Sequence, residues 1–164
     1  MLDFTPLDGK DTVAVNEMSH LATDIVREYF DPLIGKAQND YMLARFQTPQ
    51  AIAEQIAHGS RYYFVRENGQ DAGFVAFYPR DGKMYLSKFY LKKEMRGKGY
   101  AHEMLSFVLD ETKKAGLPAV FLNVNRYNDA CRAYEALGFT VARYEVNDIG
   151  NGFVMDDAVY EYTL

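Results

Sequence analysis

The sequence predicts an α/β fold with a mixed β-sheet, in which an antiparallel meander is followed by a βαβα segment and a closing hairpin. Two observations lead to this fold class. Short aromatic-rich runs separated by two-residue turns fill residues 61–91, which is typical of a meander. From about residue 100, helical and alternating patterns follow one another, which is typical of strands joined by a helical crossover.

The first sixty residues are expected to be mainly helical. Apolar side chains recur every three or four positions over residues 11–29, on one face of a helix that Pro32 should end. Thr48 is a favourable N-cap and the proline after it suits the first helical position, so a further helix should begin there. Gly59 should close that helix.

The runs 61–68, 72–79 and 84–91 are rich in aromatic and β-branched residues and are expected to form three antiparallel strands. Asn68-Gly69 and Asp81-Gly82 stand between them. Both dipeptides suit two-residue hairpin turns, so each strand should pair with the next one along the chain.

A helix is expected from about residue 100, because its apolar residues fall on one stripe. Lys113 and Lys114 suit the last turn, where cations interact favourably with the helix dipole. Gly116 should terminate the helix.

The end of the chain is expected to contain one strand, one short helix and a hairpin. Residues 119–125 alternate apolar and other side chains, which predicts a strand with one apolar face. Asn128 can cap a short helix that ends at Gly138. Two further strand-like runs flank Asn151-Gly152 and should form the closing hairpin.

Length and charge limit the classes of function. A chain of 164 residues is expected to form one domain, residues 1–164. A net charge of −5 argues against a nucleic-acid partner and fits a cationic small molecule better. Cys131 is the only cysteine, so no intrachain disulfide can form and a cytoplasmic location is expected. No signal-like or membrane-spanning apolar stretch is present, so no membrane partner is expected.

The segment RGKGYA, residues 96–101, places two glycines and two cations between a strand and a helix. Unpaired backbone N–H groups and the helix dipole favour an anion at a helix start, so a phosphate or pyrophosphate is the expected ligand. Arg96 and Lys98 can add charge-assisted contacts. A tight turn at Gly97 and Gly99 with solvated cations is the structural alternative.

Two other phosphate loops are excluded. A Walker loop needs Ser or Thr after its Gly-Lys pair, whereas Gly97-Lys98 is followed by Gly99. A dinucleotide fingerprint needs a third glycine, where this sequence has His102.

Residues 96–101 resemble the [RQ]-x-x-G-x-[GA] segment of the GNAT N-acetyltransferase family, which cradles the pyrophosphate of acetyl-CoA. FYLKKEM, residues 89–95, is similar to the end of the family's fourth strand, although Lys93 stands where a proline is frequent. ACRAYEALGF, residues 130–139, resembles the family's A-x-x-x-Y-x-x-x-G-F helix. Together the matches span residues 84–140 and imply the GNAT fold, with helices on both faces of the mixed sheet.

The resemblance implies acetyl-CoA as co-substrate and no metal. A backbone N–H at the end of the family's fourth strand binds the thioester carbonyl and the pantetheine. The residues implied to bind acetyl-CoA are Phe89, Tyr90, Leu91, Arg96, Gly97, Lys98, Gly99, Tyr100, Ala101 and Asn128. The assignment of Asn128 departs from the family pattern, because Tyr127 stands where an asparagine is often found, and a plain helix cap is the alternative.

Tyr134 occupies the position of the family's tyrosine, whose hydroxyl can protonate the departing thiolate. The alternative is a packing role on the helix face that it shares with Cys131 and Leu137. The general base is less defined. The inner positions of the fourth family strand are Ser87 and Lys88, so this strand supplies no carboxylate and water-relayed deprotonation is expected.

Acidic residues could receive a cationic acceptor. The candidates are Glu28 and Asp31 at the end of the first helix, and one of Asp156 and Asp157, since adjacent strand residues point to opposite faces. His20, His58 and His102 show no metal-ligand spacing and are expected to be surface or packing residues.

The implied function is an acetyl-CoA-dependent N-acetyltransferase acting on a primary amine of a small, polyamine-like acceptor. The helical first sixty residues and the closing hairpin resemble the bacterial polyamine-acetyltransferase branch of the family. A protein or peptide N-acetyltransferase and a non-catalytic acyl-CoA-binding sensor are the alternatives. The sequence leaves a homodimer open and does not identify the acceptor or the acyl length.

Overall fold

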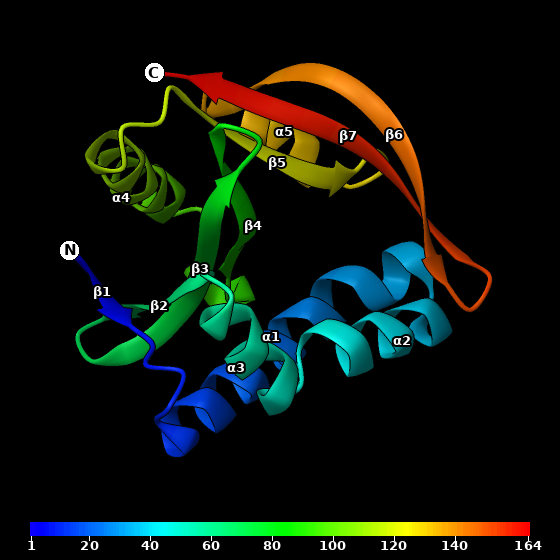
Figure 1. The fold of residues 1–164 in the computed structure, drawn as a ribbon, viewed down its shortest axis with the longest axis horizontal. Helices are drawn as coiled ribbons and strands as arrows, with labels where there is room; N and C mark the ends of the chain where they lie inside the picture. Colours follow the sequence, from blue (N-terminus) through cyan, green and yellow to red (C-terminus); the bar gives the residue numbers. More distant parts are fainter. The chain divides into compact units, whose positions relative to one another are not determined.

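The computed structural model describes residues 1–164 and confirms the predicted mixed α/β fold (Figure 1). Its seven strands follow the order β1-β2-β3-β4-β5-β7-β6 in one sheet. The elements are β1 (Leu2–Pro6), α1 (Thr12–Ile34), α2 (Lys36–Phe46), α3 (Pro49–Ala57), β2 (Arg61–Glu67), β3 (Gln70–Arg80), β4 (Lys83–Leu91), the 3-10 helix η1 (Lys93–Met95), α4 (Tyr100–Lys114), β5 (Ala119–Asn125), α5 (Ala130–Ala136), β6 (Thr140–Gly150) and β7 (Phe153–Thr163).

The chain forms two compact units, and the boundary between them crosses β3, β4 and the start of α4. The first unit contains residues Met1–Tyr78 and Lys88–Tyr100. The second contains Pro79–Ser87 and Ala101–Leu164. The two halves of β4 therefore belong to different units.

The core of the first unit lies between α1, α3 and one face of β2 and β3. Apolar residues of α1 at helical spacing, with Met18 fully buried among them, pack against alternate residues of the two strands. The strand side chains in this core are Tyr62, Phe64, Phe74 and Ala76. Figure 1 shows α1 in contact with α2 and α3, so the three helices form one layer of this unit.

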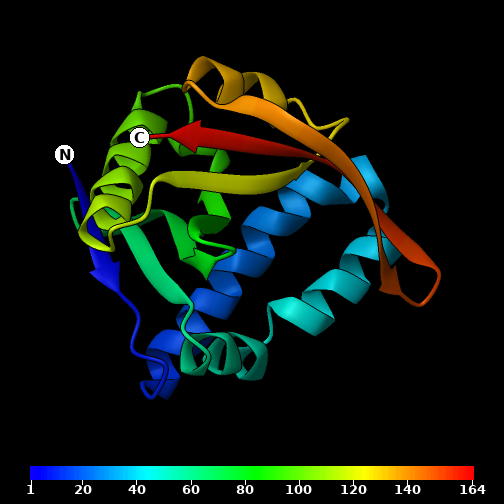
Figure 2. The ribbon, with the colours of Figure 1, turned by 45° about the horizontal axis from the view of Figure 1, so that its top comes forward.

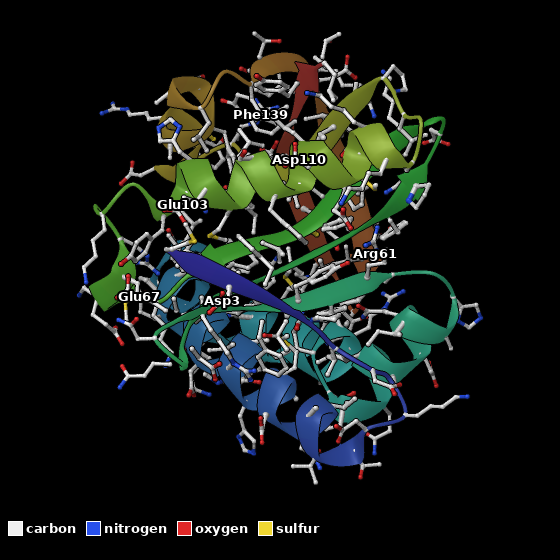
Figure 3. All side chains as sticks on the ribbon, turned by 90° about the vertical axis from the view of Figure 1, so that its left-hand side faces the viewer. Asp3, Arg61, Glu67, Glu103, Asp110 and Phe139 are labelled. Atoms are coloured by element: carbon white, nitrogen blue, oxygen red, sulfur yellow. The ribbon has the colours of Figure 1, made fainter.

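The strand β1 was not predicted. It pairs antiparallel with β2, from Leu2↔Glu67 to Pro6↔Tyr63, and Figure 3 labels Asp3 on it. This strand is only five residues long, contains an acidic residue and ends in proline, so it lacks the alternating pattern on which the prediction depends. Proline is tolerated there because β1 lies at the edge of the sheet.

The prediction that Pro32 ends the first helix was wrong. α1 continues to Ile34 and stops at Gly35, whose φ is +88° and whose N–H donates to the carbonyl of Asp31. Pro32 removes one helical hydrogen bond, but only two helical residues follow it, so little further helix depends on that bond. None of the helices, including the 23-residue α1, combines the length and apolar character needed to cross a membrane.

The predicted turns are confirmed. Asn68-Gly69, Asp81-Gly82 and Asn151-Gly152 all have two successive residues with positive φ, between 51° and 79°. This geometry matches the right-handed twist of the flanking strands. The N-cap at Thr48 is also confirmed, because its hydroxyl accepts the N–H of Ala51.

The second unit is organised around β7, which lies between β5 and β6. β7 pairs with β5 from Ala119↔Thr163 to Asn125↔Asp157, and with β6 on its other edge. The hairpin of β6 and β7 extends beyond the end of β5, as Figure 2 shows. In this unit, β4 pairs in parallel with β5 only through Met84↔Val120 and Tyr85↔Phe121.

The helix α4 is amphipathic, as the sequence predicts. It buries Met104, Leu105 and Val108. Figure 3 labels Glu103 and Asp110, which lie two turns apart on its exposed side. The helix therefore has one solvated face and one packed face.

The close approach of β3 to the end of β4 depends on Gly73. A Cβ placed on Gly73 would overlap the carbonyl oxygen of Tyr90 and lie 3.0 Å from the Cα of Leu91. The next backbone contact is a hydrogen bond of 2.8 Å from the N–H of Lys92 to the carbonyl of Ala72. Only a residue without a side chain can occupy position 73 while this spacing is kept.

Gly73→Ala is therefore expected to lower the free energy of unfolding by about 1–3 kcal/mol, because the methyl group forces the β4 backbone to shift. Urea unfolding followed by circular dichroism would measure the change. A midpoint equal to that of the wild type would contradict the close approach.

Candidate active site

The predicted phosphate turn lies between η1 and α4. Gly97 and Gly99 have φ values of 77° and 80°, in the left-handed region that other residues adopt only with strain. Both glycines are exposed, and no other atom lies within 4 Å of a Cβ placed on either. The turn is thus open above its glycines and leads directly into a helix N-terminus, an arrangement that fits a phosphate group.

Arg96 fixes one side of this turn. Its guanidinium donates to the carbonyl of Leu91 at 2.9 and 3.2 Å and pairs with the carboxylate of Glu28 at 2.5 Å. It also lies 3.9 Å above the ring centre of Tyr29. The side chain therefore connects the end of β4 to α1.

Arg96 and Lys98 differ in the partners that they have within the fold. The sequence predicts that Arg96 and Lys98 both contact the pyrophosphate. In the structure the Arg96 guanidinium already has three partners, whereas Lys98 is exposed, 6.0 Å from the ring centre of Tyr100. The remaining N–H groups of Arg96, the ammonium group of Lys98 and the backbone N–H groups of the turn stay the predicted donors to an anion.

The strand end that precedes the turn is held by aromatic packing. Phe89, Tyr90 and Leu91 are all partly buried. The ring centre of Tyr90 lies 5.4 Å from that of Phe74 and 6.1 Å from those of Tyr29 and Phe30. These contacts restrict the backbone that the resemblance assigns to the thioester.

Lys88 is an unusual residue on the same strand. The protein around its ammonium group lowers the pKa of Lys88 to about 8, although the residue keeps some accessible surface. Desolvation is the only cause of this lowered pKa, and no nearby carboxylate raises the pKa again. A substantial fraction of this amine is neutral above pH 8. The sequence shows Lys88 on the strand but gives no sign of its depressed pKa.

In the second unit, Tyr134 projects from α5 and is partly buried. Its ring packs edge-on against Phe139, with 5.7 Å between ring centres, and lies 6.2 Å from the ring of Tyr160. The hydroxyl of Tyr160 donates to Glu135 at 2.9 Å. These contacts orient the Tyr134 ring, and the role of its hydroxyl stays a prediction.

Asn128 has a clear structural role at the start of α5. Its Oδ1 accepts the N–H of Ala130 at 2.9 Å, and its carbonyl accepts the N–H of Cys131. The residue is only 8% exposed, whereas the neighbouring Tyr127 is 70% exposed. The side chain thus caps the first turn, while Asp129, the residue next to the helix, makes no side-chain cap.

Three of the candidate acids already have partners within the fold. Glu28 pairs with Arg96, and Asp31 accepts the side-chain amide of Asn39 at 2.7 Å. Asp156 lies 2.7 Å from Arg126, out of line for a hydrogen bond but close enough for an ion pair. Asp157 differs, because it is buried and one of its oxygens has no partner.

The histidines were expected to be surface or packing residues, and His20, His58 and His102 are all exposed. The structure contains no group of three His, Cys, Asp or Glu side chains arranged to hold a metal ion.

A family model described as the acetyltransferase (GNAT) family matches residues 22–139. The chain belongs to this family. It is therefore an acetyl-CoA-dependent N-acetyltransferase. A comparison with curated proteins finds no match.

The fold of this GNAT acetyltransferase is shared by solved structures over nearly their whole length. One is the PaiA N-acetyltransferase from Thermoplasma acidophilum in complex with coenzyme A, with a TM-score of 0.80 at 16% identity. The alignment covers 100% of this chain and 99% of the PaiA chain. A GNAT acetyltransferase from Elizabethkingia anophelis with acetyl-CoA bound has a TM-score of 0.66 at 13% identity, and the alignment covers 99% of this chain and 98% of that chain. An acetyltransferase from Bacillus subtilis in complex with CoA has a TM-score of 0.62 at 15% identity, and the alignment covers 100% of this chain and 99% of that chain.

If the glycine turn binds the pyrophosphate, Gly99→Glu should abolish acetyl-CoA binding, because a side chain and a negative charge enter the phosphate space. Isothermal titration calorimetry would measure this. Gly69→Glu is a matched control, since Gly69 has a φ of 79° and equally open surroundings in the hairpin of β2 and β3. Equal affinity in the folded Gly99 variant and the control would remove the turn from the cofactor site.

Proposed function

We propose that this GNAT acetyltransferase transfers an acetyl group to the primary amine of a small cationic, polyamine-like acceptor. The observation that supports a cationic acceptor is the charge balance. The net charge is −5, and Arg27, Arg96 and Arg126 are all paired with carboxylates. The chain carries 23 acidic and 18 basic side chains, and this acidic surplus favours a cationic acceptor over an anionic one.

We propose that the whole chain, residues 1–164, works as one N-acetyltransferase domain in the cytoplasm. The lone Cys131 supports a reducing compartment, because it offers no intrachain disulfide.

Acetyl-CoA supplies an activated thioester. A backbone N–H at the end of β4, within Phe89, Tyr90 and Leu91, would hold its carbonyl and pantetheine, and residues 96–101 would hold its pyrophosphate. A donor at the carbonyl stabilises the negative charge that develops there during transfer. Tight packing around Tyr90 supports this role, because such a donor must be held in place before the reaction.

The hydroxyl of Tyr134 would donate a proton to the departing sulfur. A thiol has a pKa of about 8.5 and a phenol one of about 10, so this transfer is uphill by only about 1.5 pKa units and lies within reach of a positioned phenol. The contacts of the Tyr134 ring with Phe139 and Tyr160 would set the direction of the hydroxyl.

The acceptor amine would lose its proton through water. β4 carries no carboxylate that could accept this proton. A water relay needs no fixed base on β4.

A thiol-release assay with acetyl-CoA would test the acceptor class across polyamines, amino acids, aminoglycosides and peptides. The highest kcat/KM is expected with a polyamine such as spermidine. Turnover confined to neutral or anionic acceptors would overturn the proposed acceptor class, and turnover confined to peptides would favour the peptide-acetylating alternative.

Tyr134→Phe keeps the ring but removes the proton, so kcat is expected to fall by about 10² to 10⁴ with the acetyl-CoA dissociation constant nearly unchanged. Steady-state kinetics and calorimetry would separate the two effects. Tyr160→Phe is the control, because its hydroxyl already donates to Glu135. A Tyr134 variant with full turnover would make this tyrosine a packing residue.

A further inference from the structure

A row of polar side chains crosses three strands of the second unit. Asn125 of β5, Asp157 of β7 and Glu145 of β6 are paired in register. Directly paired residues of antiparallel strands carry their side chains on the same face. Asn123, two residues before Asn125, shares that face. Asp157 lies on the middle strand of this row.

Asp157 is the most buried member of this row. It is 1% exposed, and its Oδ2 accepts the side-chain amide of Asn123 at 3.3 Å. The same amide donates to Oε1 of Glu145 at 3.2 Å. The Oδ1 of Asp157 is buried and has no hydrogen-bond partner. One amide thus serves two carboxylates, and one carboxylate oxygen is left unsatisfied.

The charges around Asp157 are unevenly compensated. Arg143 donates to Oε2 of Glu145 at 2.8 Å and lowers the pKa of that carboxyl. Arg126 pairs with Asp156, the next residue along β7. Asp157 has no cation, and burial raises its pKa, with Glu145 and Asp156 adding to the rise.

A buried carboxylate with an unpaired oxygen is costly, and a cationic hydrogen-bond donor removes that cost. Asn125 accepts the N–H of Tyr127 with its side-chain oxygen, and its uncharged amide makes no hydrogen bond to the Oδ1 of Asp157. The Glu145 side chain is 29% exposed, so the polar row reaches the surface at Glu145. A ligand could therefore approach Asp157 past a second carboxylate.

We propose that Asp157 and Glu145 form the binding site for an ammonium group of the acceptor. Asp157 Oδ1 accepts one N–H of the ammonium group at the buried end, and Glu145 attracts the cation at the exposed end. Asn123 holds the two carboxylates at a fixed spacing. An ammonium group suits this site because it carries one positive charge and three donors. This inference rests on the proposed function, since it takes the acceptor to be a cationic amine.

Binding can be measured without turnover, in protein saturated with CoA and with spermidine as the probe. Asp157→Asn is expected to weaken spermidine binding about tenfold to a hundredfold, the range for loss of a charge-assisted hydrogen bond in a buried site. Asp156→Asn is the matched control, since it removes the same charge one residue away and should change the affinity by less than about threefold. CoA affinity should be unchanged in both variants.

Equal spermidine affinity in the Asp157 variant and the wild type would overturn the site, as would an equal loss in the Asp156 control. Absence of binding by spermidine, 1,4-diaminobutane and butylamine to the wild type would also overturn it. Because these measurements need no reaction, they separate failure of this site from failure of the proposed acetyl transfer, which the thiol-release assay tests.

Thermal unfolding gives a second readout that a structural aspartate would not produce. Because the folded protein raises the pKa of Asp157, its charged form opposes folding at pH values above that pKa. Asp157→Asn should therefore raise Tm at pH 8, by about 2–4 °C for a chain of this size. The gain should shrink as the pH falls toward the ordinary aspartate pKa near 4. A lower Tm in the variant at pH 8 would identify Asp157 as a structural residue and contradict the binding site.

Discussion

The ion pair between Arg96 and Glu28 is the interaction on which the order of the candidate cofactor turn depends. Glycines at positions 97 and 99 allow the left-handed turn, but glycine also loses more conformational entropy on ordering than any other residue. The Arg96 guanidinium offsets this loss by bonding the carbonyl of Leu91, the carboxylate of Glu28 and the face of Tyr29. The turn is therefore anchored by its first residue and open at its glycines, which leaves the backbone N–H groups facing solvent.

Local sequence patterns predicted the parts of the fold that depend on near neighbours. The turn at Asn68-Gly69, the cap at Thr48 and the alternation of β5 each depend on a few adjacent residues. The short strand β1 and the helix through Pro32 were missed, because pairing with β2 and packing of α1 decide them. Those contacts join residues far apart in the sequence, and no local periodicity reports them.

The same distinction applies to the candidate site. The glycine turn was visible in the sequence because its chemistry lies within six residues. The partners of the acids were not visible, since Glu28 pairs with an arginine 68 positions away and Asp157 accepts a hydrogen bond from an asparagine 34 positions away. The sequence identified Glu28, Asp31, Asp156 and Asp157 as equivalent candidates. Burial and the lack of a cationic partner distinguish Asp157 from the other three.

Lys88 and Asp157 are both charged groups that the fold disfavours, and their pKa values move in opposite directions. Burial lowers the pKa of Lys88 to about 8, so the free-energy cost of its charged form in the folded protein decreases as the pH rises through 8. Burial raises the pKa of Asp157, so the free-energy cost of its charged form decreases as the pH falls through the pKa of the folded protein. Each group opposes folding most strongly where it is charged, Lys88 below its folded pKa and Asp157 above its own. A ligand that offsets one of these charges therefore gains the most binding free energy on the charged side of that pKa.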